Sequence, residues 1–113
     1  MSYDIIEYAD GKREWWINGQ LHRDNGPAIE REDGTREWYQ NDLLHREGGP
    51  AYEREDGTRA WYLNGKLHRG DGPAIEYADG DRSWWLNDIK YTEEEYKQEL
   101  LVRKWRLSID NSA

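Results

Sequence analysis

Three histidines recur at a constant interval of 23 residues, at His22, His45 and His68. Imidazole is a common zinc ligand, with a metal–nitrogen bond about 2.1 Å long. If each interval forms two neighbouring strands, equivalent residues of adjacent units lie ~10 Å apart. One ion cannot bridge that distance, so we predict no metal site. We expect each histidine to be positioned by hydrogen bonds to a turn or a strand.

Catalytic groups are equally hard to assign, because the candidates repeat. Acidic pairs such as Glu32-Asp33 and Glu55-Asp56 could supply a general acid and a general base, but they are too frequent here to single one out. The sequence contains no cysteine, which excludes thiolate catalysis and disulfides. An active site needs unlike groups that converge on one reacting atom. We therefore predict no enzymatic activity and no cofactor.

The elements that carry these residues form an internal repeat. Four units align, over residues 4–26, 27–49, 50–72 and 73–95. The most regular column is tryptophan, at Trp15, Trp38, Trp61 and Trp84. A fixed period of this length is typical of an array of stacked structural units.

Two turn signals in each unit predict two strands per unit. Asp33-Gly34, Asn41-Asp42 and their equivalents tolerate the positive φ angles of tight turns. The sequence therefore predicts a mainly β fold, an elongated twisted antiparallel meander of β-hairpins with about eight strands over residues 1–91. A two-residue turn at Asp33-Gly34 would place Ile29 opposite Trp38. A bulge or bend is expected at Gly48-Gly49-Pro50, within a long strand over 43–55, because proline cannot donate a ladder hydrogen bond.

Adjacent aromatic residues form two columns on opposite faces of the predicted sheet. The first column, headed by Trp15, aligns with branched residues such as Ile29 and is the candidate core. The second column is predicted to bind a protein partner, because aromatic residues with polar ends are enriched in interfaces. It consists of Trp16, Tyr39, Tyr62 and Trp85. The alternative is that the terminal helix or a second copy of the chain covers it.

Charged columns headed by Glu7 and Arg13 run through all four units. They could form a binding ladder, but such residues more often make cross-strand ion pairs on a solvated face. We expect the second arrangement.

The repeat ends before a predicted helix over residues 92–107, which is followed by a tail over 108–113. Thr92 and Glu95 have the spacing of a capping box. Acidic residues follow Thr92, and basic residues stand near the far end, which matches the helix dipole. One side of the helix can cover the end of the sheet. The remaining apolar residues predict a dimerisation surface at Leu101, Val102 and Trp105.

Composition narrows the class of partner. The chain has 113 residues and a formal net charge of −8. This acidity disfavours direct binding to nucleic acid or to an anionic membrane. A protein partner, basic or itself nucleic-acid-binding, is more compatible with it. No stretch has transmembrane length and no secretory pattern is visible, so a cytoplasmic location is expected.

The order of residues around each tryptophan resembles the MORN repeat. The shared features are the 23-residue period, Trp followed by Asn-Gly, a later His and Gly, and an Asp-Gly turn. They cover residues 4–91, in a form similar to divergent bacterial and phage repeats. The resemblance implies hairpins aligned into an elongated sheet, a scaffold or interaction role, and self-association. Arg36-Glu37 and its equivalents stand where the usual motif has glycines, as do the arginines after each histidine, so phosphoinositide binding is not carried over.

Three functional hypotheses follow. The first is a non-enzymatic protein–protein interaction module, forming a homodimer through the terminal helix. The second is a small acidic inhibitor, of the kind found in phages and toxin–antitoxin systems, that occupies a nucleic-acid-binding or active site of a host enzyme. The third is a module that binds a glycan or small ligand on Trp/Tyr platforms.

Overall fold

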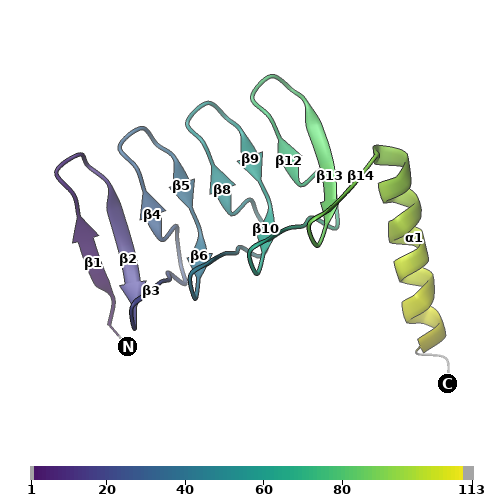
Figure 1. Ribbon diagram of the computed structural model, residues 1–113, viewed down its shortest axis with the longest axis horizontal. Coiled ribbons are helices and arrows are strands. Elements are labelled where there is room, and N and C mark those ends of the chain that lie inside the picture. Colours follow the sequence, from purple (N-terminus) through teal and green to yellow (C-terminus); the bar gives the residue numbers. More distant parts are fainter. Residues whose placement is uncertain (1, 111–113) are drawn as a thin grey trace.

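A computed structural model describes residues 2–110 as an open antiparallel β-structure followed by one helix (Figure 1). The main sheet has ten strands and is not closed into a barrel. Its strands are β1 (Asp4–Glu7), β2 (Arg13–Ile17), β3 (Gln20–Leu21), β4 (Ile29–Glu30), β5 (Arg36–Glu37), β8 (Tyr52–Glu53), β9 (Arg59–Ala60), β12 (Ile75–Glu76), β13 (Arg82–Leu86) and β14 (Ile89–Tyr91). Two short hairpins pair β6 (Tyr39–Gln40) with β7 (Leu43–Leu44), and β10 (Tyr62–Leu63) with β11 (Lys66–Leu67).

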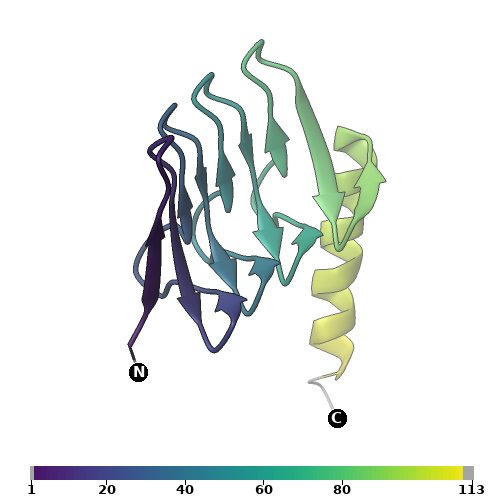
Figure 2. The same ribbon diagram turned by 60° about the vertical axis from the view of Figure 1, so that its left-hand side comes forward.

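The hairpins lie side by side like the teeth of a comb, and the molecule measures 54 × 39 × 18 Å (Figure 1). The Asp-Gly turns follow one edge of the row and the Asn turns follow the other. The short hairpins turn out of the plane of the main strands (Figure 2). The predicted elongated array of antiparallel hairpins with one C-terminal helix is therefore confirmed. The described strands outnumber the expected ones because the second and third units are interrupted at Trp38 and Trp61, and because each expected long strand is divided at the bend before its proline.

The turns at the Asn positions have two residues, as predicted. Asn41 and Asp42 have φ angles of 51° and 68°, and Gln40 pairs with Leu43 across them. Asn and Gly adopt positive φ more readily than other residues, and a tight hairpin with matching twist requires it at both central positions.

The turns at the Asp-Gly positions are one residue longer than predicted, and the predicted register is wrong. Arg31 N donates to Thr35 O at 2.9 Å, which closes a three-residue loop with Gly34 at φ 95°. Such a loop is a common hairpin connection in which glycine takes the left-handed position. Ile29 consequently pairs with Glu37 and not with Trp38.

A shift of one residue changes which side chains share a face. Ile29 lies beside Glu14 and Glu37, on the face of the second aromatic column and not beside the Trp15 column. The opposite face carries an unbroken alternation of glutamate and arginine across eight strands. Register partners along it are Glu7, Arg13, Glu30, Arg36, Glu53, Arg59, Glu76 and Arg82. The expected cross-strand pairing of these columns is confirmed, with ion pairs such as Arg13–Glu7 at 3.4 Å.

The predicted bend before the proline is also present. The long strand expected over 43–55 is divided into β7 and β8 by a bend at residues 47–49, where Gly48 has a φ of 82°. Beyond the bend, Ala51 donates its N–H to Ala60 O. The three alanines after the prolines (Ala28, Ala51 and Ala74) are completely buried, and their small side chains let adjacent units approach closely. In the first aromatic column, Trp15 is buried but Trp38, Trp61 and Trp84 are half-buried.

The terminal helix, α1 (Glu93–Asp110), begins one residue later and continues three residues further than expected. Thr92 caps it as predicted: its Oγ1 accepts from Glu95 N at 3.1 Å, and Glu95 Oε1 accepts from Thr92 N at 2.9 Å. Residues 108–110 of the expected tail are helical, and 111–113 lie outside the described residues. No helix within residues 2–110 combines the length and apolar character needed to cross a membrane.

The Asp-Gly loop geometry can be tested with two glycines that both have open space around them. Gly57 has a φ of 95°, whereas Gly70 lies outside the positive-φ region, and an added Cβ would meet nothing within 4 Å at either. Gly57→Ala should destabilise the fold by about 1–2 kcal/mol, because only the left-handed backbone penalises it. Gly70→Ala should be neutral or stabilising by up to about 1 kcal/mol. Urea unfolding of both variants makes the comparison, and a neutral Gly57→Ala would contradict the assigned turn.

Candidate functional site

One arginine in each of the first three units clamps that unit to the next. The Arg46 guanidinium lies over the Trp38 ring, 4.0 Å from its centroid. Its Nη1 donates to the Pro50 carbonyl at 3.1 Å and pairs with Glu53 at 3.2 Å. Arg23 and Arg69 repeat the arrangement over Trp15 and Trp61, each also donating to the carbonyl of the following proline.

Each clamp combines a cation–π contact with a charge-assisted hydrogen bond. Arg46 comes after the turn of its unit, whereas Pro50 and Glu53 begin the next hairpin. The clamp therefore fixes the step between units as well as the position of the tryptophan ring.

The histidines, each directly before a clamp arginine, join the same units at the Asn turns. His45 Nδ1 accepts a hydrogen bond from Asn64 N at 2.9 Å, one unit further along the chain. His22 and His68 do the same for Asn41 and Asn87, each at 3.1 Å. The expected structural role of the histidines is confirmed. Within residues 2–110, no three His, Asp or Glu side chains converge as metal ligands.

His68 shows how this role depends on charge. Burial lowers its pKa, and the nearby positive charge of Arg103 on α1 lowers it further, against the opposing effect of the Asn87 hydrogen bond. A neutral imidazole can keep Nδ1 as an acceptor, whereas a protonated one has no acceptor nitrogen.

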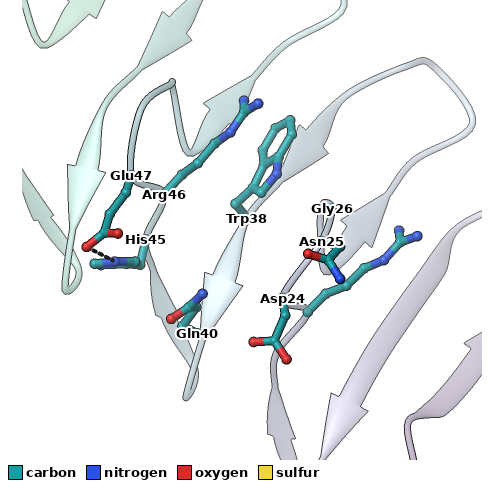
Figure 3. A pocket seen from close by; sticks show the side chains of 9 residues that line it. Asp24, Asn25, Gly26, Trp38, Gln40, His45, Arg46 and Glu47 are labelled. Carbon is teal, nitrogen blue, oxygen red and sulfur yellow. Dashed lines mark ion pairs between the residues drawn. The ribbon is translucent and has the colours of Figure 1, made fainter.

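The face that carries the clamps and the first aromatic column contains a groove between successive clamps. The first groove has a volume of about 560 Å³, and Figure 3 shows Trp38 and Gln40 between two walls. One wall is residues 23–26 and the other is residues 45–47. The second groove, of about 300 Å³, is its equivalent one unit later, with Trp61 and Leu63 between the walls.

The opposite face holds the predicted partner-binding residues, Trp16, Tyr39, Tyr62 and Trp85, all half-buried. Three of them are fixed by a hydrogen bond to the side chain two residues earlier. The pairs are Trp16 Nε1 to Glu14 (3.1 Å), Tyr39 Oη to Glu37 (3.1 Å) and Trp85 Nε1 to Ser83 (2.9 Å). Tyr62 follows Ala60 and has no such acceptor two residues earlier.

The buried glutamates control the chemistry of this face. Burial acts to raise the pKa of Glu14, but hydrogen bonds from Tyr8, Trp16 and Lys12 outweigh it and hold that pKa below its usual value. Burial and the Glu37 carboxylate raise the pKa of Tyr39 to about 12. Its hydroxyl therefore stays a neutral donor at physiological pH.

Two functional features were absent from the sequence-based prediction. The first is the arginine clamp, whose signal was the arginine column directly after each histidine. The second is the burial of Glu14 and Glu37, whose signal was a charged residue where the MORN motif has glycine. Both features depend on the cross-strand register, which the sequence-based prediction had shifted by one residue.

The predicted dimerisation residues lie on the exposed surface of α1. Leu101 and Trp105 are each 67% exposed and Val102 is 41% exposed. Residues separated by three or four positions adjoin on a helix surface, so these side chains form one apolar patch. By contrast, Tyr96 on the same helix is buried against the sheet.

Comparison with known proteins found no protein-family model that matches the chain. No curated protein matches it either. The MORN resemblance therefore remains a prediction from the repeat itself.

Proposed function

We propose that this chain is a non-enzymatic, MORN-like protein–protein interaction module. The observation that carries the proposal is the row of half-exposed aromatic side chains held in place along an open sheet. Rigid aromatic residues lose little conformational entropy on binding and are frequent energetic anchors of interfaces. The hydrogen bonds that Trp16, Tyr39 and Trp85 donate to the side chains two residues earlier supply that rigidity before any partner arrives.

We further propose that α1 mediates self-association. A contiguous apolar patch on a helix is a common interface. Pairing the patches of two copies would bury Leu101, Val102 and Trp105 while leaving the sheet faces available for a partner.

An alternative is a small acidic inhibitor of a basic target, and the edge formed by the Asp-Gly turns favours it. Exposed carboxylates stand at each of these turns, including Asp33, Asp56 and Asp79. An interaction through that edge should weaken strongly between low and high ionic strength. Binding that is indifferent to salt would exclude this alternative.

The partner-binding face can be tested by affinity capture from native lysate, followed by calorimetry with the captured protein. Tyr62→Ala should retain the fold and weaken binding by about tenfold or more, the effect of losing an interface anchor. Tyr91→Ala is the matched control, because Tyr91 is half-buried like Tyr62 but pairs with Trp84 on the opposite face of the sheet. Equal binding by the two variants would remove the proposed face.

The self-association surface has a separate test. Light scattering of the native chain should give the mass of a dimer, and Trp105→Ala should shift it toward monomer. Lys97→Ala serves as the control, since Lys97 is an exposed polar residue of the same helix. A strict monomer, unchanged by either substitution, would contradict the proposal.

A further inference from the structure

Three equivalent segments connect one unit to the next, and segments of this type form the walls of the grooves. The segments begin at Arg23, Arg46 and Arg69 and reach Gly26, Gly49 and Gly72. The first two segments line the two open grooves. Beside the third segment, the equivalent site is filled by a side chain of the protein's own helix α1.

This side chain is Tyr96, which occupies the site beside the third segment, called the third position below. Its hydroxyl donates to the Arg69 carbonyl and accepts from Gly72 N at 3.2 Å. Tyr96 is 3% exposed, and Leu86 is 1% exposed, whereas the equivalents of Leu86 in the open grooves, Gln40 and Leu63, are half-buried. Burial raises the pKa of Tyr96, so its phenol remains a neutral donor and acceptor.

The opposite end of the array shows a related contact. The Tyr3 hydroxyl accepts from Asp24 N at 3.0 Å and lies 3.3 Å from Asp24 Oδ2. Asp24 belongs to the first connecting segment. Tyrosine hydroxyls from both ends of the chain thus bond to this segment type.

The two internal grooves present the equivalent segment without a tyrosine, and its backbone differs at one position in the second groove, where Gly48 has a φ of 82°. None of the hydrogen bonds between residues 2 and 110 uses the amide groups of Gly26 or Gly49, the equivalents of Gly72. Volumes of about 560 and 300 Å³ lie within or at the edge of the range of small-ligand sites. Each groove also offers one tryptophan ring beside the segment.

We propose that these two grooves are receptors for tyrosine side chains of a partner protein, bound as Tyr96 is bound in the third position. In this arrangement a partner phenol donates to the Arg23 or Arg46 carbonyl and accepts from Gly26 or Gly49. This deepens the proposed function, on which it rests, by giving the partner a chemistry and a second contact face.

The array also sets the spacing of the partner residues. Adjacent grooves are one unit, or two strands, apart, which corresponds to ~10 Å. Two tyrosines seven positions apart on an α-helix are separated by about 10.5 Å along its axis. A partner helix lying along the row can therefore place one tyrosine in each groove.

The test uses the wild-type chain and p-cresol, the side-chain analogue of tyrosine, followed by amide NMR. The Gly26 and Gly49 amide signals should shift saturably, with a Kd on the order of 1–10 mM for so small a ligand. The Gly72 signal should not shift, because the Gly72 amide already donates to the Tyr96 hydroxyl. Toluene, which lacks the hydroxyl, should bind roughly 3- to 10-fold more weakly.

Two further measurements sharpen the result. In Tyr96→Ala the Gly72 signal should join the titrating set. A helical peptide with tyrosines at positions i and i+7 should bind at least about tenfold more tightly than p-cresol, because its second contact is intramolecular. The same peptide with phenylalanines is the control and should lose most of that gain.

Unshifted Gly26 and Gly49 signals in the wild-type chain would overturn the inference, whatever Tyr96→Ala does. Shifts produced by maltohexaose and not by p-cresol would also overturn it, and would assign the grooves to glycans. A captured partner that depends on Tyr62 but does not compete with p-cresol would leave the proposed function standing without this inference.

Discussion

The structure depends on a constant step between units, and the arginine clamp is the interaction that sets it. Arg46 touches the ring of its own unit and the backbone and carboxylate of the next. Without such a link, each hairpin would have little apolar surface with which to hold its neighbour, because the completely buried residue at each boundary is an alanine. The array is therefore held by aromatic, ionic and hydrogen-bonded contacts more than by a deep core.

The period, the hairpins and the capped helix could be predicted from the sequence, because each depends on local signals. Asn41-Asp42 encodes its own turn, and Thr92 with Glu95 encodes its own cap. The Asp33-Gly34 turn was predicted one residue too short, since the same dipeptide fits both a two-residue and a three-residue loop. That single ambiguity reversed the face of Ile29 and hid the burial of Glu37.

The candidate interfaces also differ in whether local sequence signals could predict them. The second aromatic column could be predicted because alternation within a strand is independent of the cross-strand register. The grooves could not, because they arise from segments that lie one unit apart and meet only through the fold. Tyr96 gives the clearest case: its place on a helix was predictable, but its bonds to Arg69 and Gly72 follow from where the helix docks.

The claim that the clamp sets the step between units can be tested by comparing two arginines. Arg46→Met keeps an apolar stem over Trp38 but removes the charge, and should cost about 2 kcal/mol of unfolding free energy. Arg36→Met removes an exposed arginine of the charged ladder and should cost less than about 1 kcal/mol. Chemical denaturation of both variants measures the difference. Equal losses would contradict the account, since the clamp would then be one more surface ion pair.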